Sequence, residues 1–360
     1  MTQAEILMSQ ALKLAENGLL SSAPNPAIGC VIVKDGRVIG EGFTQPPGGN
    51  HAEIQALNAA VAHGHDVRGA TVYVTLEPCS HFGRTPPCAD ALVRAGVAKV
   101  VAAMQDPNPL VAGQGLARLQ AAGIETESGV LAEQARELNI GFFSRMQRGK
   151  PWVRLKVAAS LDGKTALRNG QSQWITSQAA RDDGHMWRAR AGAILTGIGT
   201  VKEDDPQLTV RAIQLARQPL RVIVDSKLSI SPDAKILSGG GTLIFTAIVD
   251  AEKQALLQDR GTEVVVLPNA QGKVDLPQVM LELGKRQINE LHVEAGAKLN
   301  ASLIREACVD ELLVYLAPAI LGDGRGMFEL PALESLQDKF SLKFHQVMQV
   351  GEDLRILARF

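Results

Sequence analysis

The sequence predicts two α/β domains, the first of them a three-layer α/β/α sandwich. A chain of 360 residues is too long for one ordinary domain and long enough for two that each bury a core. Predicted strands alternate with predicted helices in both halves, which is typical of layered α/β folds. The alternation is interrupted at residues 146–152, where Gly149 and Pro151 break a helix and charges cluster. We therefore predict domains at 1–146 and 151–360.

The first half opens with a helix, because Thr2 and Glu5 form a capping-box pattern and apolar residues follow at helical spacing as far as Leu14. A β-hairpin comes next, joined by an Asp35-Gly36 turn. Its strands are predicted at 27–33 and 37–42, and they are followed by a helix at 51–62, a strand at 71–75, a helix at 88–95, a strand at 98–103 and further strand and helix patterns to about Arg145.

The second half contains a series of apolar runs that predict buried strands. The runs are RLKVAAS, AGAILTG, PLRVIVD, GTLIFTA, TEVVVL, ELHVEAG and ELLVYLAP, and helical patterns such as 177–191 and 275–286 separate them. No GxGxxG motif follows the first of these strands, so a doubly wound dinucleotide-binding fold is not supported.

Composition excludes several classes of protein. Lysine and arginine number 37 against 38 acidic residues, so a net charge of −1 gives no general attraction to nucleic acid or to anionic membranes. No segment approaches the roughly eighteen apolar residues of a membrane span, and the N-terminus lacks the pattern of a signal peptide. Four cysteines are too few for a disulfide framework in a chain of this size. We expect a soluble, cytoplasmic protein.

Three residues have the types and spacing of a zinc site. His51 begins a predicted helix, Cys79 follows a predicted strand, and Cys88 lies nine positions later. One imidazole and two thiolates can hold Zn²⁺ and leave the fourth position to water, whose pKa the ion would lower to about 7. Glu53 is close enough in sequence to move protons without coordinating the ion. The alternatives are a chance coincidence or a structural zinc site with His81 as fourth ligand, and we favour the catalytic interpretation.

The long cysteine loop PCSHFGRTPPC, with HAE at 51–53 and NPAIG at 25–29, resembles the bifunctional deaminase-reductases of riboflavin biosynthesis. In the second half, KVAASLDGKTA, GQSQWIT, GIGTVKEDDPQLTVR, the Asp225-Ser226 pair and VEAGAKLNASLI occur in the order of that family's reductase domain. The resemblance extends from about residue 4 to 358. It implies a cytidine-deaminase fold for the first domain and a dihydrofolate-reductase-like fold for the second.

The resemblance also implies two consecutive reactions. The first domain would remove the 2-amino group of a diaminopyrimidinone ribosylamine 5′-phosphate by means of zinc-activated water. The second would deliver a hydride from NADPH to the sugar and convert its ribosyl group to ribityl. By this resemblance His51, Cys79 and Cys88 are the zinc ligands, and Glu53 is the proton shuttle.

Carried over position by position, the resemblance assigns two sets of binding residues. Those that would face NADPH are Ala158, Trp174, Thr200, Asp204, Ser226, Gly296, Ala297, Lys298, Leu299, Asn300, Ala301 and Ser302. Those that would face the substrate are Ser172, Arg188, Leu208, Arg211 and Glu294 in the second domain, and Asn25 and Arg84 in the first. Asn25 could equally be an ordinary turn residue, and Arg84 a solvated loop charge. Lys156 is a candidate for positioning or protonating the opened sugar.

Two competing hypotheses stay open at this point. The chain could be a zinc deaminase of another nucleobase whose second half is a binding or dimerisation module. It could also be a non-enzymatic scaffold stabilised by zinc, in which Glu53 would have no role. The expected partner is a small pyrimidine ribosylamine phosphate, with no nucleic acid and no membrane. The resemblance favours a homo-oligomer, and the apolar, strand-rich second half could supply an extended interface for it.

Overall fold

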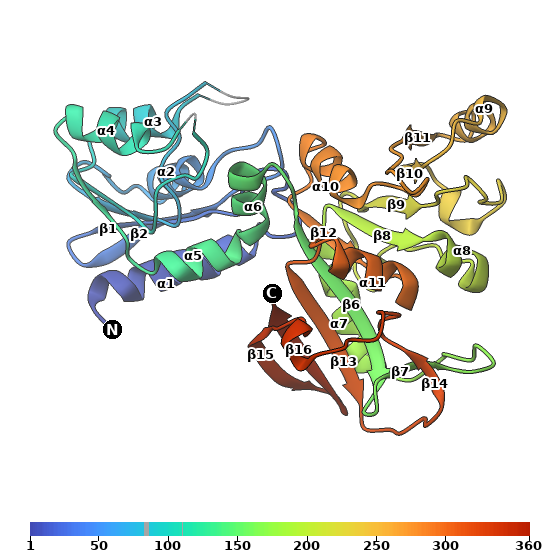
Figure 1. Ribbon diagram of the computed structural model, residues 1–360. Helices are drawn as coiled ribbons and strands as arrows, with labels where there is room; N and C mark the ends of the chain where they lie inside the picture. Colours follow the sequence, from blue (N-terminus) through green and yellow to red (C-terminus); the bar gives the residue numbers. More distant parts are fainter. Residues whose placement is uncertain (83–85, 110) are drawn as a thin grey trace. The chain divides into compact units, whose positions relative to one another are not determined.

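The computed structural model describes residues 1–82, 86–109 and 111–360, which form two compact units (Figure 1). Unit 1 is Met1–Gly149 and unit 2 is Lys150–Phe360. Each has its own buried clusters of apolar side chains. In the described part of the chain, no helix is both long and apolar enough to cross a membrane.

Unit 1 is built on a five-stranded sheet in the order β2-β1-β3-β4-β5. β1 pairs antiparallel with β2 and β3, whereas β3, β4 and β5 run parallel. The strands are β1 (Gly29–Lys34), β2 (Arg37–Phe43), β3 (Thr71–Val74), β4 (Lys99–Ala102) and β5 (Glu125–Ser128). The start of β1 therefore lies at the same edge of the sheet as the ends of β2 and β3.

Helices cover both faces of this sheet, as Figure 1 shows. They are α1 (Gln3–Glu16), α2 (Ala52–Ala62), α3 (Cys88–Ala95), α4 (Gln114–Ala121), α5 (Ala132–Leu138) and α6 (Ile140–Arg148). Alternate residues of β1 serve the two faces: Cys30 and Ile32 pack in the cluster that contains α2, α3 and α4, whereas Val31 and Val33 pack with α1 and α5. The three-layer α/β/α prediction is confirmed.

The local signals in the first half act as the sequence predicts. The Thr2 side chain accepts a hydrogen bond from the backbone of Glu5, and the Glu5 side chain accepts one from Thr2, which completes the capping box of α1. Asp35 and Gly36 both have positive φ angles, as a two-residue hairpin turn requires.

Unit 2 contains a nine-stranded sheet in the order β11-β10-β9-β8-β12-β6-β13-β16-β15. The first seven of these are parallel neighbours, and β16 and β15 are antiparallel additions at one end. The strands are β6 (Trp152–Ser160), β8 (Ala193–Gly197), β9 (Leu220–Val224), β10 (Thr242–Thr246), β11 (Thr262–Val266), β12 (Glu290–Val293), β13 (Glu311–Ala317), β15 (Lys343–Val350) and β16 (Asp353–Arg359). A separate ribbon pairs β7 (Lys164–Leu167) with β14 (Gly324–Gly326).

The helices of unit 2 divide between the two faces of the sheet. They are α7 (Gln178–Arg190), α8 (Ile198–Asp204), α9 (Ala251–Gln258), α10 (Leu276–Lys285) and α11 (Ala297–Arg305), with single 3₁₀ turns at Lys235–Leu237 and Leu336–Asp338. α10 and α11 cover one face, and α7, α8 and α9 pack in clusters on the other. The predicted strands of the second half all form, but the sequence patterns did not identify β7, β14, β15 or β16.

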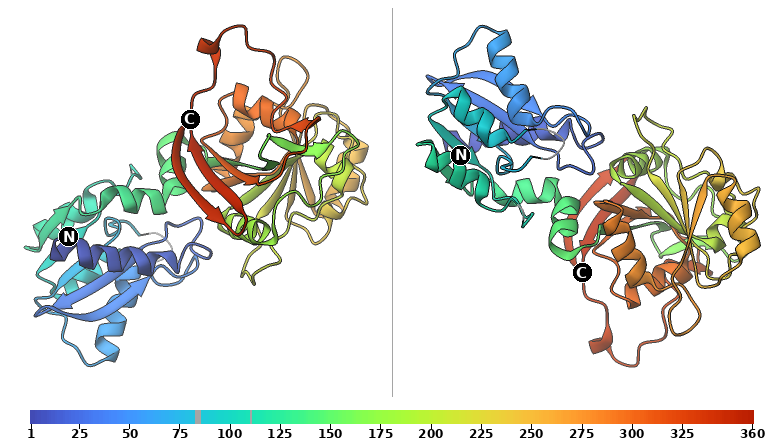
Figure 2. Two further views of the ribbon diagram at one scale, coloured as in Figure 1. Left: turned by 90° about the horizontal axis from the view of Figure 1, so that it is seen from below. Right: turned by 90° about the horizontal axis from the view of Figure 1, so that it is seen from above.

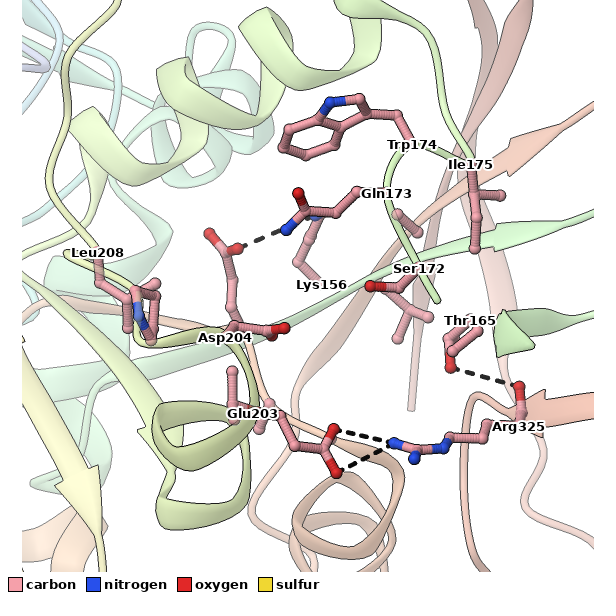
Figure 3. Close-up of a pocket in the computed structure, with 18 of the residues that line it drawn as sticks. Lys156, Thr165, Ser172, Gln173, Trp174, Ile175, Glu203, Asp204, Leu208 and Arg325 are labelled. Carbon is pink, nitrogen blue, oxygen red and sulfur yellow. Dashed lines mark hydrogen bonds and ion pairs between the residues drawn. The ribbon is translucent and has the colours of Figure 1, made fainter. Parts of the chain in front are cut away.

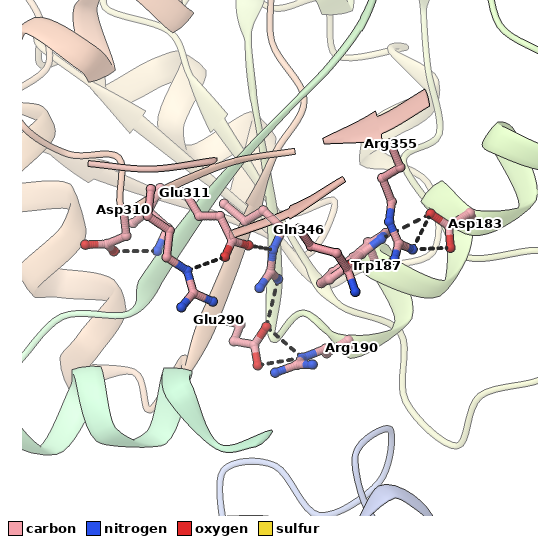
Figure 4. Close-up of polar contacts among 11 residues, drawn as sticks. Asp183, Trp187, Arg190, Glu290, Asp310, Glu311, Gln346 and Arg355 are labelled. Carbon is pink, nitrogen blue, oxygen red and sulfur yellow. Dashed lines mark hydrogen bonds and ion pairs between the residues drawn. The ribbon is translucent and has the colours of Figure 1, made fainter. Parts of the chain in front are cut away.

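A network of ion pairs is buried beneath α7 (Figure 4). Arg154 on β6 is 3% exposed and donates hydrogen bonds to both Glu290 and Glu311. Arg190 binds Glu290 and Arg359 binds Glu311, so that each carboxylate contacts two guanidinium groups. A buried charge is tolerated only with such partners. The network fixes α7 and β16 against the central strands.

β15 forms one end of the sheet, visible as a dark red strand in Figure 2. Residues 343–349 are all exposed, and Phe344, Val347 and Met348 are among them. The segment that precedes β15, residues 329–342, is exposed over almost its whole length and extends away from the sheet of unit 2 (Figure 2). In the described chain this edge has no pairing partner beyond β16.

Candidate active sites

The three predicted metal ligands lie together at the edge of the unit 1 sheet. His51 is the N-cap of α2, Cys79 lies in the loop after β3, and Cys88 is the first residue of α3. His51 Nδ1 is 3.6 Å from Cys79 Sγ and 3.3 Å from Cys88 Sγ, and all three atoms lie within 4.8 Å of one another. Residues separated by 37 positions thus form one cluster.

The cluster fits a zinc ion. Tetrahedral ligands at Zn–S and Zn–N distances of about 2.3 and 2.0 Å would lie roughly 3.5 Å apart. The Cys88 thiol and the His51 ring lower the pKa of Cys79 to about 4, so a thiolate is available. The Cys88 backbone N–H also donates to Cys79 Sγ at 3.3 Å. Among the described residues, no further histidine, cysteine or carboxylate joins these three as a fourth ligand. His81 is therefore not part of the cluster.

Glu53 is buried on the first turn of α2, two residues beyond His51. Burial and, to a smaller extent, the nearby Cys79 raise its pKa to about 7 against the opposing effect of His51. A carboxyl group whose pKa is close to neutral exchanges protons efficiently at that pH. The position and the pKa suit a proton shuttle.

Close helix packing brings α2 to this edge. A Cβ atom on Gly42 of β2 would lie 2.5 Å from the carbonyl oxygen of Ala52, which leaves no room for a side chain. Glycine at this position therefore lets the first turn of α2, with His51 and Glu53, lie directly against the sheet.

Glu77 is a structural residue of this site that the sequence analysis missed. Its buried carboxylate accepts hydrogen bonds from the backbone N–H groups of Asp106, Gly113, Gly115 and Leu116, at 2.8 to 3.2 Å. These bonds fix the start of α4 beside the segment that carries Cys79. The signal was a charged residue in the otherwise apolar strand end TVYVTLEPC.

The structure places Asn25 in the segment that leads into β1, at the edge that carries the metal ligands. Its side chain is half-buried. Arg84, the other candidate for substrate contact, lies outside the described residues.

Unit 2 contains a cavity of about 930 Å³ at the carboxyl ends of β6, β8 and β12 (Figure 3). Figure 3 shows how its walls form: Lys156 comes from β6, Ser172 to Ile175 from the segment after β7, Glu203 and Asp204 from α8, and Arg325 from β14. Ligand sites of open parallel sheets occur at such strand ends.

Most of the predicted reductase residues line this cavity. Those that do are Ala158, Ser172, Trp174, Arg188, Thr200, Asp204, Leu208, Arg211, Glu294, Gly296, Ala297 and Asn300. Those that do not are Ser226, Lys298, Leu299, Ala301 and Ser302. Ser226 lies at the end of β9, where its Oγ accepts a hydrogen bond from the backbone of Val274.

The donor set at α11 fits a dinucleotide cofactor. Gly296 is the N-cap of this helix and lines the cavity together with Ala297, so unpaired backbone N–H groups are available to phosphate oxygens. Asn300 also lines the cavity, and its buried Oδ1 has no hydrogen-bond partner among the described residues.

Glu294 is the central acidic group of the cavity. Arg188 of α7 binds it through two guanidinium nitrogens, with Nη2 2.9 Å from Oε2, and Lys156 Nζ lies 3.9 Å from the same oxygen. His292 Nε2 lies 3.2 Å from Oε1. Burial would raise the pKa of Glu294, but Arg188 and Lys156 outweigh it and hold the pKa well below the ordinary value of 4.5. Glu294 is therefore ionised at any pH that an enzyme assay uses.

Other residues of the cavity lie outside the sequence motifs and were not predicted. Arg325 of β14 binds Glu203 of α8 at 2.9 Å across one side of the cavity (Figure 3). Arg181 lies 4.5 Å above the ring of Trp174, which is itself 69% exposed. Trp174 is therefore not the buried core residue that an isolated tryptophan usually is.

Two family models match the chain. Residues 1–104 match the zinc-binding region of cytidine and deoxycytidylate deaminases, and residues 151–356 match the RibD C-terminal domain.

Full-length relatives agree with these matches. The chain is 47% identical to riboflavin biosynthesis protein RibD of Escherichia coli, over 98% of each chain. It is 46% identical to RibD of Haemophilus influenzae, over 98% of this chain and 96% of the relative. Among solved structures, Acinetobacter baumannii RibD has a TM-score of 0.91 at 44% identity. A diaminohydroxyphosphoribosylaminopyrimidine deaminase/5-amino-6-(5-phosphoribosylamino)uracil reductase from Thermotoga maritima has a TM-score of 0.89 at 34% identity. Each comparison covers 99% of this chain and 98% of the solved chain.

The ion pair of Glu294 predicts a pH-dependent contribution to the stability of unit 2. Glu294→Gln should lower its free energy of unfolding at pH 7 by about 3–5 kcal/mol, because Arg188 is left buried without its anion. Since the folded pKa is depressed, this stabilisation is present above pH 4.5 and is lost as the pH falls through the folded pKa. The difference between wild type and variant should therefore shrink in acid.

Tryptophan fluorescence during denaturation measures this directly, because Trp152, Trp174 and Trp187 all lie in unit 2. Glu263→Gln is the matched control: this carboxylate also binds an arginine, Arg286, but is 53% exposed, and its loss should cost about 1 kcal/mol or less. Equal effects of the two substitutions would contradict the buried ion pair.

Proposed function

This chain belongs to the RibD family, and from that premise we propose that His51, Cys79 and Cys88 hold its zinc ion and that Glu53 transfers protons at the same site. The protein is a bifunctional deaminase and reductase of riboflavin biosynthesis. It combines a zinc-dependent, cytidine-deaminase-like domain with an NADPH-dependent, dihydrofolate-reductase-like domain. We assign deamination to residues 1–146 and reduction to residues 151–360.

We propose as substrate 2,5-diamino-6-(5-phosphoribosylamino)pyrimidin-4(3H)-one. Loss of the 2-amino group gives 5-amino-6-(5-phosphoribosylamino)uracil, and reduction then converts the ribosyl group to ribityl. Support comes from the Thermotoga maritima relative, whose description contains both the deaminase and the reductase activity. Because this substrate is a small charged metabolite, we place both reactions in the cytoplasm.

Glu53 is the side chain to which we assign proton transfer in the deamination. Zinc, when bound, lowers the pKa of a water molecule to about 7 and so supplies the nucleophile. With its own pKa at about 7, Glu53 can take one proton from the attacking water and give it to the ring nitrogen. It can then carry the second proton of that water to the amine, so that the C–N bond breaks, ammonia leaves and a carbonyl group remains on the ring. Asn25 is assigned to hydrogen bonding with the substrate.

In unit 2 we assign the wall at α11, with Gly296, Ala297 and Asn300, to NADPH, which supplies the hydride. Ala158, Trp174, Thr200 and Asp204 line the same cavity and complete this set, and Ser226 with Lys298, Leu299, Ala301 and Ser302 stay predictions outside the cavity wall.

On the substrate side of the cavity we assign Ser172, Leu208, Arg211 and Glu294. Arg188 is bound in a fork by Glu294, so its role is to hold that carboxylate in place. We assign the substrate phosphate to Arg211, which is exposed and donates a hydrogen bond from Nη1 to Gln207 Oε1 at 3.0 Å. Lys156, at the inner end of the cavity beside Glu294, is placed to position or protonate the opened sugar.

One cluster carries the proposal for unit 1. It has three candidate ligands, no fourth protein ligand among the described residues, and a buried carboxyl group of nearly neutral pKa on the first turn of the helix that His51 caps. A zinc site that only stabilised the fold would need four ligands and no such carboxyl group. If the chain were a deaminase of another nucleobase with a binding module as its second half, the cavity of unit 2 would have no catalytic role.

We also propose that the protein is a homo-oligomer that pairs through β15. Among the described residues, β15 pairs with β16 alone and exposes Phe344 (76%) and Val347 (54%). Such an edge strand is unusual for a monomer, because it invites pairing with another chain. A second copy of the same strand satisfies both the backbone groups and the apolar side chains.

Replacing Glu53 by Gln should lower the deamination rate by about 10²–10⁴-fold, since the amide cannot transfer protons. Zinc content, measured by metal analysis, should stay at the wild-type level. Reduction of the deaminated substrate, followed by NADPH absorbance, is the internal control and should not change.

Removing zinc with a chelator should have the same selective effect, and added zinc should restore deamination. If Glu53→Gln deaminates at the wild-type rate, or if chelation abolishes the reduction as well, the assignment of roles to the two units is wrong.

For the oligomer, light scattering should give a mass of at least two chains for the wild type and of one chain for Val347→Lys, because a buried interface does not tolerate the charge. Leu256→Lys on α9, where the side chain is 44% exposed, is the control and should not alter the mass. A wild type that is monomeric at assay concentration would contradict the proposal.

A further inference from the structure

We propose that Asn139 is a positioning residue for the deamination: it holds the backbone around Asn25 in place and influences the substrate only through Asn25. The inference rests on the proposed function, in which Asn25 contacts the substrate. Asn139 lies at the junction of α5 and α6, as the C-cap of the first helix and the N-cap of the second.

The Asn139 amide forms two hydrogen bonds with a single backbone unit. Its Oδ1 accepts from the N–H of Ala27 at 2.8 Å, and its Nδ2 donates to the carbonyl oxygen of Ala27 at 2.9 Å. Both residues are buried, at 7% and 2% exposure. The amide side chain thus pairs with the N–H and the C=O of Ala27 as the backbone of a neighbouring strand would. It satisfies two backbone groups that are costly to bury without a partner.

The backbone on the other side of Asn25 is also held. Arg145 of α6 donates from Nη2 to the carbonyl oxygen of Pro24 at 3.2 Å, and the N–H of Asn25 donates to the carbonyl oxygen of Ser22 at 3.0 Å. Asn25 therefore lies between two backbone positions that the same helical segment fixes.

Residues 24–29 lead into β1 at the edge of the sheet where the predicted metal ligands lie. Ile28 N–H donates to the Thr44 hydroxyl and Gly29 N–H to the Thr75 hydroxyl, both at 3.1 Å. Thr44 follows β2 and Thr75 follows β3, the two strands after which the metal ligands occur. A shift of the backbone at Ala27 would move Asn25 relative to those ligands.

Asn139 lies outside the segment that the zinc-binding family model matches. That match ends at residue 104, and Asn139 contacts a residue 112 positions away in the chain. Residues of the last helical segment of unit 1 thus hold the backbone that leads into its first strand.

The experiment is a kinetic comparison in the full-length, zinc-loaded protein. Asn139→Leu keeps the volume of the side chain but loses both hydrogen bonds, and it should raise KM for deamination about tenfold or more. Asn139→Asp keeps the acceptor for the Ala27 N–H but places a buried carboxylate oxygen against the Ala27 carbonyl oxygen, so its effect should be at least as large. Zinc content and the reduction of the deaminated substrate should stay at the wild-type level in both variants.

A double-mutant cycle tests whether Asn139 acts through Asn25. Asn25→Ala should raise KM by itself, and adding Asn139→Leu to it should have almost no further effect, whereas independent contributions would multiply. Multiplying effects would overturn the inference. If Asn25→Ala raises KM and Asn139→Leu does not, the inference fails while the role of Asn25 stands; if neither does, both fail.

Val67→Ala is the control for a general loss of stability. Val67 is a buried member of the main apolar cluster of unit 1, but it precedes β3 and so lies at the opposite edge of the sheet. It should lower the melting temperature without raising KM. An equal rise in KM in this variant would show that destabilisation alone explains the effect of Asn139→Leu.

Discussion

The free-energy cost of burying carboxylates organises both units of this protein. A buried carboxylate needs hydrogen bonds or cations, or its pKa rises until it takes up a proton. Glu77 is held by four backbone N–H groups and fixes the loop beside the metal ligands. Glu294 is held ionised by Arg188 and Lys156. Glu53 is the exception, because burial outweighs its favourable contacts and its pKa reaches about 7. The same cost thus gives two carboxyl groups that are held rigidly in place and one that is able to exchange protons.

Local chemistry made much of this predictable from the sequence. The predicted metal ligands, Glu53, the first helix cap and the buried strands depend on residue types within short segments. The structure brings the three predicted ligands together and confirms the cap and the strands. The exposed strand β15 has no buried face, so no alternation of apolar and polar residues marked it. The fork from Arg188 to Glu294 and the bonds from Asn139 to Ala27 join positions 106 and 112 residues apart. No pattern within a single segment can reveal such pairs.

The two sites also show how side chains from outside a motif complete it. In unit 1 we propose that the motif residues supply metal ligands and a proton carrier, and Glu77 and Asn139 hold backbone segments beside them. In unit 2 the strand ends supply Lys156 and Glu294, while α7 and β14 supply Arg188 and Arg325. All described residues of each site lie within one unit. The two reactions can therefore be separated by substitutions within one chain.

Product identity tests the central claim most directly. The purified protein would receive the diaminopyrimidinone ribosylamine phosphate with zinc and NADPH, and mass spectrometry would follow the pyrimidine. The account predicts the ribitylaminouracil phosphate, with the deaminated ribosyl compound as the only intermediate. Accumulation of that intermediate, with NADPH unconsumed, would contradict the role given to the cavity of unit 2. No change in the pyrimidine would contradict the proposed substrate and the account as a whole.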